Sequence, residues 1–290
     1  EHKMKILITG AYGQLGYSLS KFRSTKDKVY RTGVKIPLGE KGLRLNIIDN
    51  IMLKDIILSL SPDIIINLAA ITNVDFCESN PKIAKEINTN GVQNLVDVFP
   101  GKIIHLSTDY VFDGLNGPYK EEDQINPISV YGKTKYDAEK IVLEKENNLV
   151  LRANVLYDSL KYNNASFLNW VVNNLKNKNS IKVVDDQYNN PTWTESIAKV
   201  LMLCLNNNIS GLYHWGDEDY LSRYDFAIKI AKAYGLESSL IKKIPTSELN
   251  QLAPRPLNGG LDQNKLKNIL KIIPPKINDC LNAILIKEAE

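Results

Sequence analysis

Tyr131 and Lys135 lie four residues apart in the segment Val-Tyr-Gly-Lys-Thr-Lys. On a helix, residues at this spacing share a face, so both side chains can reach one pocket. Free tyrosine, with a pKa near ~10, is a poor acid at neutral pH, and a nearby ammonium lowers that pKa. The pair is therefore a candidate proton-delivery site, although the same spacing also occurs where a packed ring lies beside a solvated amine.

A hydroxyl precedes this pair in Ser107-Thr108-Asp109, directly after an apolar run. Open α/β sheets bind ligands at the carboxyl ends of their strands, which is where Thr108 is expected. Its hydroxyl could hydrogen-bond a substrate carbonyl oxygen, which gains charge as hydride arrives. Thr108, Tyr131 and Lys135 together predict carbonyl reduction.

Three glycines, Gly10, Gly13 and Gly16, follow the first apolar run. Glycine permits a tight turn and close approach of the backbone to a pyrophosphate, which the N-terminus of the next helix also attracts. The spacing G-x-x-G-x-x-G differs from the common G-x-G-x-x-G dinucleotide fingerprint, and a ligand-free turn is the alternative. The flanking strand and helix patterns favour dinucleotide binding.

The end of the second expected strand suggests which dinucleotide binds. An acid there usually recognises a ribose without a 2′-phosphate, but residues 30–35 contain no acid and two cations, Arg31 and Lys35. Both could accept a 2′-phosphate, so NADPH is favoured and NADH stays possible. Solvated loop charges are the alternative interpretation.

Short β-branched runs alternate with helical patterns in the N-terminal half, which is typical of βαβ units and a parallel sheet. We expect an α/β fold: a Rossmann-type doubly wound parallel sheet over residues 4–158, with a smaller, mainly substrate-binding part over 159–290. A strand near 181–184 and a helix near 194–205 are expected to rejoin the first part. Expected strands are 5–9, 28–32, 64–68, 102–107, 149–152 and 181–184. Expected helices are 14–22, 50–60, 81–98, 130–145, 167–176, 194–205, 224–234 and 264–270.

Bulk composition excludes several classes of protein. The net charge of +3 arises from 36 basic and 33 acidic residues without a basic cluster, so no nucleic-acid partner is expected. No apolar run is long enough to span a bilayer. Cys77, Cys204 and Cys280 are odd in number and favour a reducing, cytoplasmic setting over a disulfide framework. Cys77 with Asp75 and Glu78 could suggest a metal, but a helix start is preferred, and no metal site is predicted.

Longer segments resemble the extended short-chain dehydrogenase/reductases, and more narrowly the dTDP-4-dehydrorhamnose reductases. The resemblance covers most of the chain, and its most specific part is Ser-Thr-Asp-Tyr-Val-Phe-Asp-Gly. Besides the glycine turn, the matching segments are Asn67-Leu-Ala-Ala-Ile-Thr-Asn-Val-Asp-Phe-Cys-Glu78, Ile87-Asn-Thr-Asn-Gly91, Leu106-Ser-Thr-Asp-Tyr-Val-Phe-Asp-Gly114, Asn126-Pro-Ile-Ser-Val-Tyr-Gly-Lys-Thr-Lys135, Asp186-Gln-Tyr-Asn-Asn-Pro-Thr192 and Arg255-Pro256.

This resemblance assigns roles to individual residues. It implies that Thr108, Tyr131 and Lys135 are catalytic, and that Thr108, Asp109, Val155 and Arg255 lie near the substrate. Arg255 would suit a diphosphate, or be a surface loop charge. The implied cofactor-binding residues are Gly10, Tyr12, Gly13, Gln14, Leu15, Gly16, Arg31, Ala69, Ala70, Thr72, Asn88, Tyr131 and Lys135.

Two positions depart from the family pattern. Val155 stands where many of these reductases carry a tryptophan near the sugar, and Ser18 replaces a glutamate linked in some members to Mg²⁺ and dimer contact. Glu195 keeps a second such carboxylate, but one carboxylate is poor evidence for a metal.

The resemblance implies reduction of the 4-keto group of a nucleotide-linked deoxysugar by NADPH, for cell-surface polysaccharide or other glycan precursors, in a possible homodimer. One alternative is an epimerase or dehydratase of the same fold. Another is a non-catalytic NADP-binding subunit, such as the regulatory β subunit of methionine adenosyltransferase.

Overall fold

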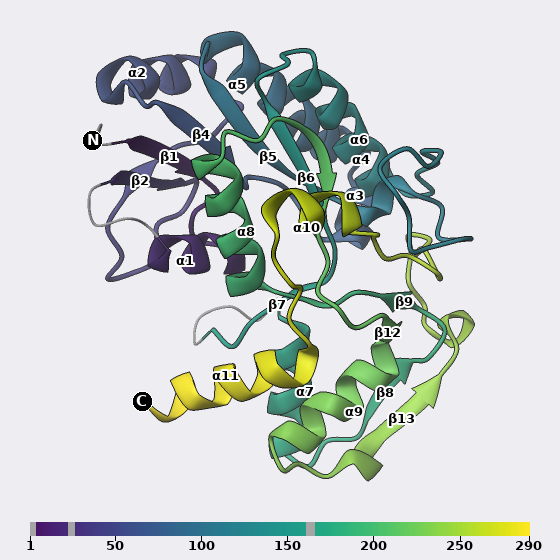
Figure 1. Ribbon diagram of the computed structural model, residues 1–290. Coiled ribbons are helices and arrows are strands. Elements are labelled where there is room, and N and C mark those ends of the chain that lie inside the picture. The colour runs from purple at the N-terminus through teal and green to yellow at the C-terminus, as the bar shows by residue number, and fades with distance from the viewer. Residues whose placement is uncertain (1–3, 23–26, 161–165) are drawn as a thin grey trace.

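A parallel sheet of seven strands forms the larger part of the molecule (Figure 1). The computed structural model describes residues 4–22, 27–160 and 166–290. Each strand of the sheet pairs in parallel with its neighbours, in the order β11-β6-β5-β4-β1-β2-β3. The predicted Rossmann-type fold is confirmed. The strands are β1 (Lys5–Thr9), β2 (Lys28–Gly33), β3 (Leu43–Arg44), β4 (Ile64–Asn67), β5 (Lys102–Thr108), β6 (Leu149–Ala153) and β11 (Gly211–His214).

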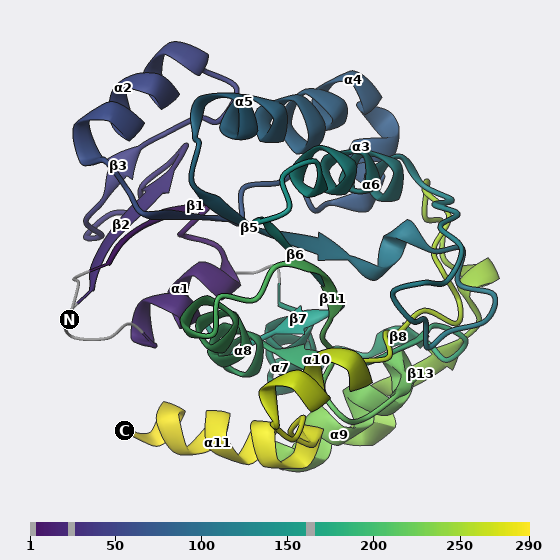
Figure 2. The ribbon, with the colours of Figure 1, turned by 45° about the horizontal axis from the view of Figure 1, so that its top comes forward.

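Helices cover both faces of this sheet (Figure 2). Alternate residues of one strand enter different cores: Ile6 and Ile8 pack in the cluster with α1 and α8, whereas Leu7 packs in the cluster with α2, α5 and α6. Two-sided burial is why the strands read as continuous apolar runs. The helices of one face are α2 (Asn50–Leu60), α3 (Val74–Ser79), α4 (Pro81–Lys85), α5 (Gly91–Val98) and α6 (Val130–Leu143); those of the other are α1 (Gln14–Lys21) and α8 (Thr194–Asn206).

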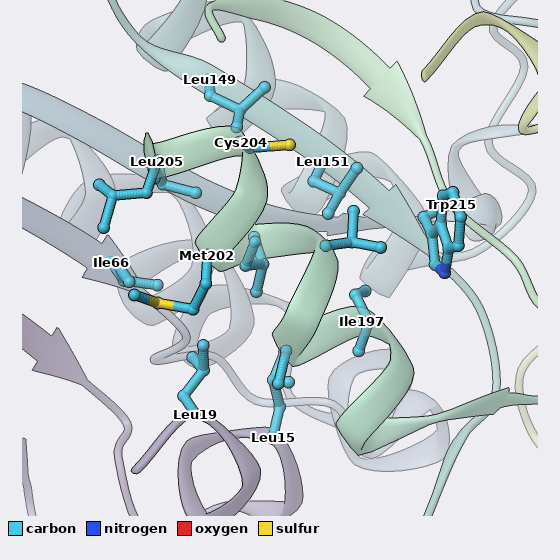
Figure 3. Packing of buried hydrophobic residues seen from close by; sticks show 14 of the residues in the cluster. Leu15, Leu19, Ile66, Leu149, Leu151, Ile197, Met202, Cys204, Leu205 and Trp215 are labelled. Carbon is cyan, nitrogen blue, oxygen red and sulfur yellow. The ribbon is translucent and has the colours of Figure 1, made fainter. Parts of the chain in front are cut away.

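The helix expected near 194–205 does pack on the central sheet. In Figure 3, Ile197 and Met202 of α8 lie among Leu15 and Leu19 of α1 and side chains of the strands behind them. The strand expected to rejoin the same sheet does not: β8 (Ile181–Val184) pairs with β13 (Ile241–Ile244) in the smaller part. A short apolar run predicts a strand but contains no information on its partner. The strands at the two edges of the sheet, β3 and β11, were not predicted.

The smaller part packs below the sheet in Figure 1, and its segments lie in the sequence on both sides of α8 and β11, which belong to the larger part. Its core joins α7 (Phe167–Lys176), α9 (Arg223–Ala233) and α11 (Ile277–Ala289) with β8 and β13. Short connections complete it: β7 (Leu156–Tyr157) with β10 (Thr192–Trp193), β9 (Tyr188–Asn189) with β12 (Leu221–Ser222), and α10 (Asn264–Leu270). Across the described part of the chain, every helix is too short or too polar to cross a membrane.

Candidate active site

A cleft of about 740 Å³ opens at the carboxyl ends of β1, β4, β5 and β6. Residues from motifs far apart in the sequence line it, as expected where the strand order reverses between β1 and β4. The predicted site residues on its wall are Gly10, Gly13, Gln14, Leu15, Gly16, Ala69, Ala70, Thr72, Thr108, Asp109, Tyr131 and Val155.

The glycine turn has two glycines that shape it and one that leaves room for a ligand. Gly10 has φ +62°, and a Cβ there would lie 2.7 Å from the Ala69 nitrogen; at Gly16 it would lie 2.2 Å from the Ala11 oxygen. At Gly13, the N-cap of α1, the nearest atom would be 3.6 Å away, and this residue is exposed to the cleft. The Gln14 Oε1 beside it is buried with no partner among the described residues. Space next to the helix N-terminus fits a pyrophosphate.

Tyr12 and Arg31 lie beyond this end of the cleft and do not line it. The Arg31 guanidinium stacks over the Tyr12 ring at 4.7 Å and over Tyr17 at 5.2 Å, and its Nη1 donates to Glu40 at 2.6 Å. Gly33, two residues further along β2, is on the cleft wall. Arg31 is therefore next to the cleft but engaged by Glu40, and its predicted contact with a cofactor stays a prediction.

Tyr131 stands in the first turn of α6, which Ser129 caps by accepting a hydrogen bond from the Gly132 amide at 3.2 Å. The ring is 8% exposed and packs against Cys77 and Ala84. Burial raises the pKa of Tyr131 above its usual value, and a hydrogen bond with Thr108 offsets part of this effect. The structure thus differs from the expectation that Lys135 lowers this pKa, because the Lys135 amine is turned toward β5.

Lys135 lies one helical turn further, only 4% exposed, and does not line the cleft. Its Nζ donates to the Leu106 carbonyl at 2.7 Å and lies 3.2 Å from His105 Nε2. Burial lowers the pKa of Lys135 to about 8, against the charge of Glu139, which raises it. The amine therefore sits directly behind the reacting wall.

Asn88 occupies a π-helical turn, Glu86–Asn90, that interrupts the helix predicted over 81–98. Its Oδ1 accepts from the Ile71 amide at 2.7 Å, and its Nδ2 donates to the Ile71 carbonyl at 3.0 Å and to Thr134 Oγ1 at 3.2 Å. The side chain is wholly buried and does not line the cleft. It braces the loop after β4 against α6, one residue before Lys135, and its direct cofactor contact stays a prediction.

Asp109 links the catalytic wall to the smaller part of the molecule. Thr108 Oγ1 donates to its carboxylate at 3.3 Å, and the Gly260 amide does so at 3.5 Å. Burial raises the pKa of Asp109 to about 6, while nearby Arg223 lowers it. The carboxyl is thus poised to change charge near neutral pH.

A second cavity, of about 500 Å³, adjoins the cleft, since Tyr110 and Arg223 line both. Arg255 lines this second cavity, where its Nη2 pairs with Asp75 at 3.0 Å. Arg223 has a cation–π contact with Phe167 at 5.2 Å but no ion pair within the described residues. Sequence reasoning missed Arg223.

A local sequence signal could have found Arg223. Ser222 begins α9 by accepting a hydrogen bond from the Asp225 amide at 3.0 Å, which is the pattern of a helix start. Arg223 is therefore the first helical residue and lies at the rim of the smaller part. The predicted helix began one residue later.

Val155, between β6 and β7, has φ +38°, a strained value for a β-branched side chain. The preceding Asn154 is 3% exposed, and its side chain interacts with the Asp109 carboxyl, whose pKa this interaction lowers in part. Backbone strain of this kind concentrates at functional sites. Val155 lines the cleft where the resemblance places the substrate.

The two positions connected with a metal in some relatives have other partners. Ser18 bonds to Thr194 Oγ1 at 2.6 Å and to Asp158 at 3.2 Å, all buried. Glu195 pairs with Lys21 at 3.1 Å and with Lys287. In the part of the chain that the structure describes, no three His, Cys, Asp or Glu side chains could hold a metal ion together.

Comparison with known proteins agrees with this geometry. The chain is 36% identical to a dTDP-4-dehydrorhamnose reductase of Aggregatibacter actinomycetemcomitans over 93% of its own length and 94% of the relative's. It is 33% identical to methionine adenosyltransferase 2 subunit beta of Xenopus laevis over 91% and 82%. The crystal structure of a Bacillus anthracis dTDP-4-dehydrorhamnose reductase in complex with NADP is similar, with TM-score 0.90, 28% identity, and 99% and 100% coverage. The family described as RmlD substrate binding domain matches residues 4–289, and the chain belongs to this family.

Proposed function

We propose that this protein is an NADPH-dependent reductase of the 4-keto group of a nucleotide-linked deoxysugar, acting in the synthesis of glycan precursors. The observation that supports it most is the meeting of Thr108 and Tyr131 on one wall, between the glycine turn and Arg223. The reductase and NADP complex named among the relatives support the same reaction.

The dinucleotide would be held by the glycine turn and by the loop Ala69–Thr72, which both line the cleft and lie side by side at Gly10 and Ala69. When bound, NADPH supplies the hydride that forms the new C–H bond at the carbonyl carbon. The Thr108 hydroxyl orients the carbonyl oxygen and stabilises its developing charge. Tyr131 donates its phenolic proton to that oxygen, so an alcohol forms and a phenolate remains on the protein. In its charged form, Lys135 would stabilise this phenolate once its amine turns from the Leu106 carbonyl toward Tyr131.

The second cavity suits the nucleotide end of the substrate. Arg223 and Arg255 both line this cavity, and their two guanidinium groups favour a diphosphate. Phe167 and the exposed ring of Trp170 line it, with ring centroids 5.6 Å apart, and offer a surface for a nucleobase. The keto sugar would then lie between this cavity and Tyr131.

Oxidation of NADPH against a panel of nucleotide 4-keto sugars, with and without EDTA, tests this function. We expect turnover with at least one such sugar, slower turnover with NADH, and no loss in EDTA, because Glu195 is occupied by lysines. Absence of NADPH oxidation with every sugar would contradict the proposal. Size-exclusion chromatography tests the predicted homodimer, and cell fractionation the predicted cytoplasmic location.

A non-catalytic role is the second candidate, because the chain is also similar to a methionine adenosyltransferase 2 subunit beta. In that case the protein would bind the dinucleotide and act through a second chain. Co-purification with that chain, together with no NADPH oxidation, would favour this role over the reductase.

A further inference from the structure

His105 lies in the middle of β5 and is wholly buried. It takes no part in the hydride or proton transfer of the proposed reduction. Its two ring nitrogens have different partners. Nε2 lies 3.2 Å from Lys135 Nζ, and Nδ1 lies 2.9 Å from the side-chain nitrogen of Asn67 on β4. The imidazole thus connects the catalytic lysine to the interior of the sheet.

A chain of side chains continues from His105 across two more strands. Thr9 Oγ1 on β1 donates to Asn67 Oδ1 at 2.5 Å, and the Ala69 amide donates to Thr9 Oγ1 at 3.4 Å. Thr9, Asn67 and His105 are direct register partners on neighbouring strands, so the backbone holds them in line. All three are at most 1% exposed.

The direction of these hydrogen bonds fixes the tautomer of His105. An amide nitrogen can only donate, so Asn67 requires a lone pair on His105 Nδ1. A neutral imidazole then carries its proton on Nε2, facing Lys135. If the Asn67 amide were flipped, its nitrogen would face Thr9, and the Thr9 hydroxyl would lose Asn67 Oδ1 as an acceptor. The Ala69 amide cannot replace that acceptor, because it only donates to Thr9 Oγ1.

His105 is also held uncharged. Burial and the neighbouring charge of Lys135 lower the pKa of His105 well below its usual value. An Nε2–H group can donate to an uncharged amine, but it opposes an ammonium, which has no lone pair. The uncharged amine can accept from His105 and still donate to the Leu106 carbonyl at 2.7 Å.

We propose that His105 is a positioning residue for Lys135: with Asn67 and Thr9, it holds the amine behind Tyr131 and favours its uncharged form. Glu139 opposes this effect from the same helix, and its charge is shared with Arg152 of β6 at 2.6 Å. On α6, Tyr131 lies one turn before Lys135 and Glu139 one turn after it, and Lys133, Tyr136 and Asp137 are the titratable residues between them. The effect on turnover rests on the proposed function, whereas the state of His105 and Lys135 does not.

Nitrogen-15 NMR of the histidine rings tests the tautomer directly in the unmodified protein. The chain contains only three histidines, and the His105→Gln and His214→Gln variants assign the signals. We expect His105 to be uncharged, with its proton on Nε2, between about pH 5 and 8. A charged ring, or a proton on Nδ1 in this range, would overturn the proposal whether or not the protein reduces any sugar.

The Asn67→Asp variant reverses the polarity of the chain with little change of shape. Its carboxylate accepts from Nδ1, so Nε2 becomes an acceptor and the Lys135 ammonium is favoured. We expect the pKa of Lys135, followed by NMR of the lysine side chain and assigned with Lys135→Met, to rise by about one pH unit or more. Thr9→Val removes the hydrogen bond to Asn67 Oδ1 but adds no charge, so it should raise the pKa of Lys135 by less.

Kinetics separate this role from a merely structural one. With a keto sugar that is reduced, the alkaline limb of kcat should move upward in Asn67→Asp and, by less, in Thr9→Val, since Lys135 stays charged to higher pH. Variants that retain the wild-type melting temperature but lower kcat equally at all pH values, with the pKa of Lys135 unchanged, would refute the proposal.

Discussion

The cleft wall formed by β5 and α6 buries its polar side chains, whereas the wall formed by α7 and α9, which lines the second cavity, leaves the cation Arg223 without an ion pair among the described residues. Directly behind the first wall, Lys135 is 4% exposed and held by Leu106 and His105. On the second, Arg223 lines both cavities and, within the described residues, pairs with no carboxylate. The first wall is organised before a ligand arrives, which favours catalysis. The second is completed only by an anionic ligand, which favours selection of the substrate.

The largest effect should follow from a change in the organised wall. Tyr131→Phe removes the proton donor but leaves the ring packed against Cys77 and Ala84. We expect kcat to fall by about 10²–10⁴-fold, with NADPH affinity, measured by fluorescence titration, largely unchanged. Near-full turnover of a verified substrate by this variant would show that the wall does not deliver the proton.

The two arginines that line the second cavity, Arg223 and Arg255, allow a matched comparison. Arg223→Gln removes a guanidinium that forms no ion pair in residues 4–22, 27–160 and 166–290, and we expect KM for the nucleotide sugar to rise about 10- to 150-fold, for a lost charged hydrogen bond of 1.5–3 kcal/mol. Arg255→Gln should raise it less, because Asp75 already engages that side chain. Equal effects of the two substitutions on KM would contradict the difference in pairing.

Asp109 contacts both walls and should connect stability to pH. Its pKa is raised from 3.8 to about 6. The protonated carboxyl therefore contributes fully to the free energy of unfolding below pH 3.8, and this contribution is lost as pH rises through 6. Asp109→Asn removes this loss, and the unfolding free energy of the variant relative to wild type should increase by about 2–3 kcal/mol between pH 4 and 7.5. Urea denaturation at both pH values measures it, and a difference that does not change with pH would be inconsistent with a titrating carboxyl.

The smallest effect concerns the cofactor end of the cleft. Glu40→Gln releases Arg31 from a partly exposed ion pair, with side chains 19% and 27% exposed. Such pairs contribute about 0–1 kcal/mol, so affinity for NADPH relative to NADH should rise by up to about fivefold. Arg31→Gln is the control and should lower this ratio. No change in either variant would show that Arg31 does not reach the 2′-phosphate.

The wall formed by β5 and α6 could be predicted from the sequence better than the wall formed by α7 and α9. Tyr131, Lys135 and the glycine turn are local patterns whose spacing contains the geometry, so their place on α6 and α1 was predicted. Arg223 is the first residue of α9 and follows Lys135 by 88 residues, so its helix start is a local pattern but only tertiary packing brings its side chain to the cleft.

Partners across the sheet were likewise not predictable. Nothing in the spacing indicates that His105 faces Lys135, or that burial raises rather than lowers the pKa of Tyr131. The strand β8 was predicted by its apolar run. Its expected place in the central sheet was wrong, because β8 pairs with β13, whose residues lie sixty positions further along the chain. Local chemistry is readable in a sequence, whereas charge environment and long-range pairing require the fold.

The function of the two walls together is tested most directly by one comparison of substrates. NADPH oxidation would be measured with a nucleotide-linked 4-keto deoxysugar and with the same sugar lacking the nucleotide. We expect rapid oxidation with the first and a loss of most of kcat/KM with the second, because only the first engages Arg223 as well as Tyr131. No oxidation with any nucleotide-linked keto sugar, or equal rates with and without the nucleotide, would contradict this function.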